Sequence, residues 1–247
     1  MKIVCDGVVD GCTAALLQPY SGQSDAVDPI RPVDMLKEVI QRADTGGIQC
    51  AIHAIGDKVV NQAISVLAED GSPSQQHRIE HLALTTSDNK KRLGKLGITA
   101  SIQPVHSDPT LLKAWPSLIG PHQCWRAFAY KEFLDGDAPL AIGTDTPSAR
   151  HLPFQNLYSA TTRRSVLDPE TGEAIDPHLG LTLAQAATAA TTDATYARLA
   201  DSWTGSLKGG LSADFVVVDT QWTPETLLED KVSQTWYRGE KMYDAGS

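Results

Sequence analysis

The stretch IQCAIHAIGDKVVNQAISVLAEDGSPSQQHRIEHLAL, residues 48–84, decides the fold class. It opens with a short apolar run, 48–54, and closes with another, 77–84. Between them the sequence has helical periodicity, and one face carries only apolar side chains: Val59, Val60, Ala63, Ile64 and Leu67. Near-continuous apolar strands that alternate with amphipathic helices are typical of a parallel sheet with helices on its outer face.

The same alternation extends in both directions from this stretch. Further apolar runs are KIVCD at 2–6, ITASIQPV at 98–105 and PLAIGTD at 139–145, and residues 33–40 contain a second amphipathic helical face. The chain therefore supplies five strands, whereas a closed (β/α)₈ barrel needs eight. The pattern fits either a smaller open α/β sheet or the last five strands of a barrel.

The C-terminal part of the sequence changes character. Residues 181–200 are rich in alanine and predict a helix, with Thr182 as its N-cap. Two glycine-flanked segments, 205–219 and 234–244, predict strands of a small β-structure. We therefore expect an α/β unit at 1–204, either an open sheet or a partial barrel, and a separate β-subdomain at 205–247, with loops at 18–32 and 164–180.

The amino-acid composition argues against some classes of binding partner. The formal net charge of −9 argues against nucleic acid and anionic membranes, both of which attract clustered basic residues. No apolar run approaches the ~20 residues of a transmembrane helix. The four cysteines form no CxxC pair, which favours free thiols in a reducing compartment and a cytoplasmic location. The sequence begins inside a predicted strand, so we expect that its start was cut.

Polar residues occur where the predicted strands end. His53 and His81 close or nearly close two strands, Asp145 closes the fifth, and Lys2 lies in the first. Strand ends of an α/β barrel meet at one mouth, and two imidazoles with a carboxylate are good ligands for Zn²⁺. A neutral lysine amine that reacts with CO₂ would add a bridging carbamate. The structural alternatives are core or surface histidines, a solvated lysine and a turn aspartate.

Several segments together resemble the amidohydrolase superfamily, and most closely its family 3, which includes enzymes similar to N-substituted formamide deformylase. The motifs are HAIGD at 53–57, RIEH at 78–81 and GTDTP at 143–147, followed by GSLKGGLSADFVVVD at 205–219. The resemblance implies an α/β fold made of the C-terminal five strands of a TIM-type barrel, with part of a small β-sandwich. It also implies metal-dependent hydrolysis of carbon–nitrogen bonds in a small amide or formamide-like substrate.

The resemblance also implies roles for individual residues. Lys2 matches the strand-four lysine that is carboxylated in many members, and His53 and His81 match the ligands of a second metal. Asp145 matches the aspartate that binds the first metal and transfers the proton. His106, Asp57 and Arg78 are candidates for substrate binding or for support of the ligands. A surface position for His106 and an ordinary ion pair for Arg78 with Glu80 remain the alternatives.

One feature of the family pattern is missing. The family carries a His-x-His pair on its first barrel strand, and this sequence contains none. The resemblance places these two ligands before Met1. We therefore expect the chain either to need a complementary N-terminal segment or to self-associate as a homo-oligomer through its open sheet edges. The rival interpretations are a catalytically incomplete remnant, a single-metal deaminase-like enzyme in which Lys2 is structural, and an unrelated open-sheet binding module.

Overall fold

A five-stranded parallel sheet forms the centre of the molecule in the computed structural model, which describes residues 1–246. The strands follow one another in chain order across the sheet, and each pairs in parallel with the next. All five strands expected from the sequence are present, with shorter bounds: β1 Lys2–Val4, β2 Ala51–Ala54, β3 Arg78–His81, β4 Thr99–Ile102 and β5 Leu140–Ile142.

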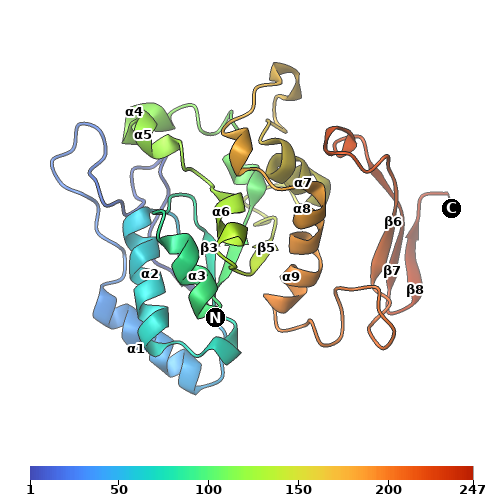
Figure 1. The fold of residues 1–247 in the computed structure, drawn as a ribbon, viewed down its shortest axis with the longest axis horizontal. Helices are drawn as coiled ribbons and strands as arrows, with labels where there is room; N and C mark the ends of the chain where they lie inside the picture. The colour runs from blue at the N-terminus through green and yellow to red at the C-terminus, as the bar shows by residue number, and fades with distance from the viewer. Residues whose placement is uncertain (247) are drawn as a thin grey trace.

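Helices cover the sheet as the alternation predicts (Figure 1). Neighbouring helices contact one another in the series α1 Val33–Thr45, α2 Asp57–Asp70, α3 Asn89–Leu96 and α6 Tyr130–Asp135. On α2 the predicted apolar face is buried against the sheet, because its side chains recur once per helical turn. Strand β4 is buried at every residue and β2 at three of its four, which explains why these runs contain almost no exposed polar positions.

The connections between strands contain short helices and single turns. The long link from β4 to β5 carries one 3-10 turn and two short helices before α6. Three further α-helices lie between β5 and β6. These elements are η1 Pro73–Gln75, η2 Pro104–Ser107, α4 Trp115–Ile119, α5 Pro121–Cys124, α7 Pro153–Thr162, η3 Pro169–Thr171, η4 Pro177–Leu179, α8 Leu183–Ala190, α9 Thr192–Tyr196 and η5 Pro224–Thr226. The predicted loop at 164–180 therefore contains two 3-10 turns, and 18–32 contains no helix or strand.

The helix expected over 181–200 is divided in two. Thr182 is its N-cap as predicted, with a full capping box: the Gln185 N–H donates to the Thr182 hydroxyl oxygen, and the Thr182 N–H donates to Oε1 of Gln185. The helix stops at Thr191, whose backbone (φ −120°, ψ −89°) leaves the helical region before α9 begins. The alanine-rich composition predicted helix throughout and carried no signal for this break.

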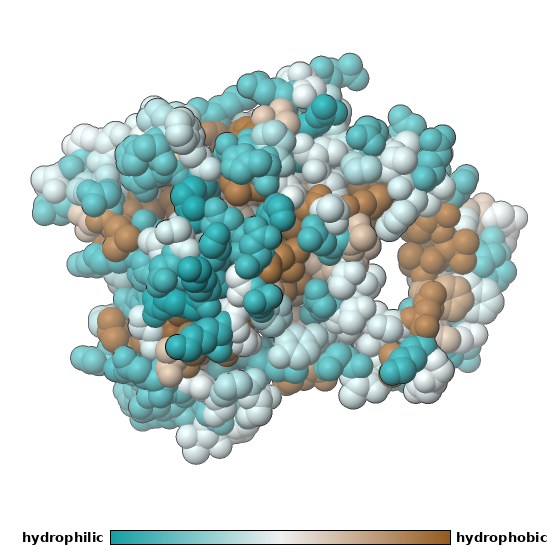
Figure 2. Space-filling view, viewed as in Figure 1, coloured by the Kyte–Doolittle hydropathy of each residue, from teal (hydrophilic) through white to brown (hydrophobic). Residues whose placement is uncertain are grey.

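The C-terminal strands form one antiparallel sheet, β6 Phe215–Asp219, β7 Lys231–Tyr237 and β8 Glu240–Asp244. The predicted run at 205–219 is strand only from Phe215. The run at 234–244 is a hairpin rather than one strand, because Arg238 and Gly239 both adopt positive φ and turn the chain. Figure 2 shows apolar surface on this sheet, and its exposed side chains include Val216, Met242 and Tyr243. No described helix is long and apolar enough to cross a membrane.

Candidate metal centre

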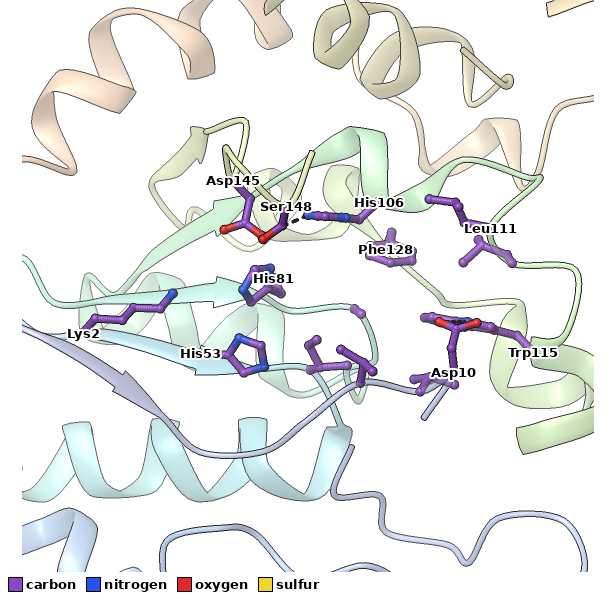
Figure 3. A pocket seen from close by; sticks show the side chains of 15 residues that line it. Lys2, Asp10, His53, His81, His106, Leu111, Trp115, Phe128, Asp145 and Ser148 are labelled. Atoms are coloured by element: carbon purple, nitrogen blue, oxygen red, sulfur yellow. Dashed lines mark hydrogen bonds and ion pairs between the residues drawn. The ribbon is translucent and has the colours of Figure 1, made fainter. Parts of the chain in front are cut away.

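The carboxyl ends of the strands meet at one cavity of about 440 Å³ (Figure 3). Lys2 reaches it from β1, His53 from β2 and His81 from the last position of β3. His106 enters from η2 just after β4, and Asp145 lies three residues beyond the end of β5. Parallel strand direction explains the convergence of the histidines and Asp145, since each strand leaves the sheet at the same edge. Lys2 is the first residue of β1 and borders the same cavity.

Two of these residues have an unusual backbone. His81 has φ of 76° and Asp145 has φ of 57°, in the left-handed region that non-glycine residues rarely adopt. The adjacent Leu82 also has positive φ, and its N–H donates to the carbonyl of Ala54 on β2. Strain of this kind persists where surrounding structure enforces it, and it is concentrated at functional sites. Here it directs two side chains into the same cavity.

His81 is the most buried imidazole of the cluster. Its ring lies 4.5 Å from that of His53 and 6.0 Å from that of His106, measured between centroids. Desolvation, followed by the positive charges of His53 and Lys2, lowers the pKa of His81 to about 4. Neither ring nitrogen has a hydrogen-bond partner among residues 1–246. His81 is thus a neutral imidazole with a free lone pair.

Three side chains approach closely enough to share an ion. One ligand atom each from His81, His106 and Asp145 lies within 4.8 Å of the other two. The Nε2 atom of His106 is 3.2 Å from Oδ2 of Asp145. The sequence predicted only a substrate-facing or surface role for His106, which directly follows the predicted strand at 98–105. The 3-10 turn at 104–107 brings it back over the mouth.

His53 lies beside Asp6, a residue for which the sequence predicted no role. Its Nε2 lies 3.3 Å from the carbonyl oxygen of Gly7 and 3.6 Å from Oδ1 of Asp6. Asp6 is 1% exposed and accepts three backbone N–H bonds, from Ala15, Ile55 and Gly56. Burial raises the pKa of Asp6, and the three N–H donors and His53 oppose that rise. The available signal was its position as the polar residue that closes the first predicted strand.

Gly56 shows why the HAIGD motif needs a glycine. A Cβ at this position would lie 2.1 Å from the carbonyl oxygen of Ala15. The backbone can approach this closely only without a side chain, and the approach lets the Gly56 N–H reach Asp6.

Lys2 has no hydrogen bond or ion pair for its amine within the described chain. Desolvation lowers the pKa of Lys2, against the opposing effects of Glu80 and Asp145. A lysine with a depressed pKa has a larger neutral fraction, which is the form that reacts with CO₂. Lys2 also borders a second cavity of about 420 Å³, together with Arg78 and Glu80.

Arg78 and Asp57 do not line the cavity that holds the histidines. Arg78 Nε donates to Glu80 at 2.6 Å, which is the ion pair that the sequence left open. Glu80 also accepts from Ser101 and Gln103, so this carboxylate is fully engaged. Asp57 begins α2 and accepts the Leu17 N–H at 2.8 Å. It therefore supports the loop that also donates to Asp6.

The aromatic residues between β4 and β5 have three different environments. Trp115 and Phe128 line the cavity, Tyr130 is fully buried in the core, and Trp125 is 71% exposed. Aromatic side chains in such a segment can line a pocket or fill the core, and only their tertiary positions separate these cases.

The donor set fits a divalent cation. Neutral imidazoles and a carboxylate are the usual protein ligands of Zn²⁺, and they lie here within reach of a common point. His81 supplies an imidazole that the described protein does not otherwise use, and such an unpartnered donor is what an ion would satisfy. The residues present are therefore compatible with a metal centre.

Comparison with known proteins gives the family. A profile of the amidohydrolase family matches residues 1–243. Protein LONG AFTER FAR-RED 3 of Arabidopsis thaliana is 30% identical over 98% of this chain and 42% of that protein. N-substituted formamide deformylase of Arthrobacter pascens is 22% identical over 97% of this chain and 43% of that enzyme.

A solved structure agrees with these matches. An uncharacterized metal-dependent hydrolase from Pyrococcus horikoshii superposes with a TM-score of 0.75 and 26% identity, over 86% of this chain and 42% of that one. The chain thus spans less than half the length of each of these three proteins. With a profile match over nearly its whole length and a parallel sheet whose strand ends carry the polar cluster, the chain belongs to the amidohydrolase family.

Proposed function

We propose that the site hydrolyses a carbon–nitrogen bond of an amide or formamide-like substrate with the help of a divalent metal. The metal that we propose is Zn²⁺. The observation that carries this proposal is the convergence of His81, His106 and Asp145 within 4.8 Å at the mouth of the sheet. His53 and Lys2 border the same cavity and complete the proposed ligand set, with Lys2 as its carbamate.

Asp145 is the proposed proton carrier. A bound divalent ion supplies Lewis acidity, which makes water more acidic and polarises a carbonyl. Asp145 faces the cavity and accepts the proton from the attacking water, and it then returns that proton to the leaving nitrogen as the carbon–nitrogen bond breaks. The products are a carboxylic acid and an amine. Nε2 of His106 lies 3.2 Å from Oδ2 of Asp145, so both side chains face the same part of the cavity.

We further propose that the five parallel strands correspond to the last five of a TIM-type barrel in a cytoplasmic enzyme, with units at 1–204 and 205–247. A complete binuclear site would then need the His-x-His pair that this sequence lacks, supplied by a complementary segment. Strands β1 and β5 each pair on one side only in the described sheet, so they offer edges for such an addition.

A single-ion site is the second candidate, and a specific observation favours it. The three residues that lie closest together supply two imidazoles and one carboxylate, and Lys2 is not among them. Three protein ligands with an open fourth position are typical of catalytic zinc. In this version Lys2 is a structural or substrate-facing amine. Mass spectrometry of the intact protein prepared with bicarbonate and Zn²⁺ separates the two, because only the binuclear version carries a carbamate.

Zinc titration and hydrolysis assays test the proposed function. We expect the 247-residue chain to bind Zn²⁺ weakly and to hydrolyse simple amides only when a segment with the His-x-His pair is added. Its mass in solution will show whether it self-associates. A chain that binds no Zn²⁺ at all would contradict a metal centre, and full turnover by the chain alone would contradict the need for added ligands.

A further inference from the structure

The cavity at the strand ends is chemically divided along its length. Lys2, the three histidines and Asp145 occupy one end, and in Figure 3 the other end holds Leu111, Trp115, Phe128 and Asp10. The metal chemistry proposed above uses only the polar end. The second end therefore needs a separate explanation, and we call it the apolar chamber, defined by Val8, Ala83, Leu111, Leu112, Trp115 and Phe128.

The inner wall of the apolar chamber is rigid. Trp115 and Phe128 are each 4% exposed, and their rings stack with centroids 5.5 Å apart at an interplanar angle of 28°. Phe128 has φ of 55°, and its N–H donates to the Ala83 carbonyl at 2.8 Å. The Trp115 indole N–H donates to Oδ2 of Asp10 at 3.3 Å. Both rings are thus fixed before any ligand arrives, which reduces the entropy lost on binding.

The outer wall leaves apolar surface open to solvent. Val8 is 47% exposed and Leu111 is 46% exposed, although both border the cavity. Covering such surface stabilises a complex by about 25 cal/mol for each Å² removed from water. A ligand that carries an apolar group gains this contribution, and a small polar amide does not.

One charged group stands at this end. Among the described residues that line the cavity, Asp10 is the charged side chain beside the aromatic wall, and the cationic Lys2 belongs to the polar end. A ligand whose amide lies at the polar end and whose far end is a carboxylate would place two negative charges near one another. Neutral and cationic groups meet no such repulsion.

We propose that the site binds amides whose substituent is largely apolar and about the size of one aromatic ring. The end of this substituent is uncharged or cationic, because Asp10 excludes substituents that end in a carboxylate. This inference rests on the proposed function for the position of the amide. The apolar chamber itself is built by residues that take no part in the proposed metal chemistry.

Binding of three probe amides tests this inference on the 247-residue chain. The probes are acetamide, phenylacetamide and phenylacetamide with a para-carboxylate, with dissociation constants from ligand-detected NMR titrations. We expect phenylacetamide to bind at least about tenfold more tightly than acetamide, and the carboxylate probe about tenfold more weakly than phenylacetamide. Asp10→Asn should reduce the second difference to within about threefold.

A matched pair of leucine variants locates the binding. Leu111→Gln should weaken phenylacetamide by about threefold or more without changing acetamide, since it removes exposed apolar wall. Leu207→Gln, at a leucine that is 82% exposed and lies outside the cavity, should change neither. Thermal unfolding of both variants checks that each remains folded.

The outcomes separate this inference from the proposed function. Each titration is repeated with Zn²⁺ while ammonia release is measured. Equal affinity for acetamide and phenylacetamide overturns the apolar-substituent inference, even if amides are hydrolysed. A phenyl preference that Leu111→Gln leaves unchanged also overturns it. A phenyl preference that Leu111→Gln reduces by about threefold or more supports it. If hydrolysis is then absent with every probe and added segment, only the proposed function fails.

Discussion

Two histidines four residues apart, His77 and His81, lie at opposite ends of β3 and have opposite environments. Both are buried, at 4% and 8% exposure. His77 uses both ring nitrogens: Nδ1 accepts the Cys50 N–H at 3.0 Å, and Nε2 lies 3.0 Å from Oδ1 of Asp44. His81 uses neither within the described chain and sits on a strained backbone. The same side chain therefore stabilises the fold at one end and is available for chemistry at the other.

The difference teaches how to recognise a site among similar residues. At the amino end, Asp44 also accepts from the hydroxyl and N–H of Ser72, so every group in that cluster is satisfied. At the carboxyl end, unpaired imidazole nitrogens face a cavity beside a carboxylate. Burial and residue type are alike in the two clusters, and only the count of unmet hydrogen bonds distinguishes them.

The largest expected effect is on the free energy of unfolding, and it concerns Asp6, which accepts three backbone N–H bonds next to the site. Asp6→Ala should lower the free energy of unfolding by about 3–5 kcal/mol, because three buried backbone N–H groups lose their acceptor. Urea denaturation measures the change. Asp201→Ala, at an exposed aspartate, is the control and should change stability by less than about 0.5 kcal/mol. A small effect of Asp6→Ala would mean that the site end does not depend on this carboxylate.

The second prediction contrasts the two histidines directly. His81→Ala should weaken Zn²⁺ binding by about 100-fold, because it removes a proposed ligand and loss of a supporting partner alone costs 10–100-fold. Isothermal titration calorimetry measures the affinity. His77→Ala is the matched control and should leave the affinity within about twofold, provided that it is measured where the variant is folded. Equal losses of Zn²⁺ affinity in the two variants would contradict the different roles assigned to His77 and His81.

The third prediction concerns the stability of the two histidine variants instead of their Zn²⁺ affinity. His77→Ala should lower the free energy of unfolding by about 2 kcal/mol, since it leaves the Cys50 N–H and Asp44 without their buried partner. His81→Ala should cost less in metal-free protein, because no hydrogen bond of its ring is lost. Chemical denaturation in the presence of a chelator compares the two, and a larger loss for His81→Ala would contradict the assignment of roles.

The smallest effect is a pH dependence at the amino end. Hydrogen bonds from Ser72, with a further contribution from His77, lower the pKa of Asp44 below its usual 3.8. The carboxylate therefore stabilises the folded state at pH above about 3.8, and this contribution is lost as the pH falls through the lower folded value. The stability gap between wild type and Asp44→Asn should be constant near neutral pH and shrink below pH 3.8. Denaturation at several pH values checks this, and a constant gap would contradict it.

Much of the architecture was predictable from local pattern. The five strands, their parallel order and the apolar face of α2 follow from residues that recur with the period of a strand or helix. The bounds were less predictable: the helix over 181–200 breaks at Thr191, and 234–244 folds as a hairpin. Both errors occur where backbone conformation, rather than hydrophobic periodicity, ends an element.

The sequence by itself determined that His53, His81 and Asp145 would lie at one edge of a sheet, because strands that share a direction share an exit. Only the tertiary structure decided that His106 returns to Asp145, that Asp6 supports His53, and that Arg78 and Asp57 serve other contacts. Those outcomes depend on the paths of connecting loops and on packing between segments distant in the chain. Local periodicity carries no information about either.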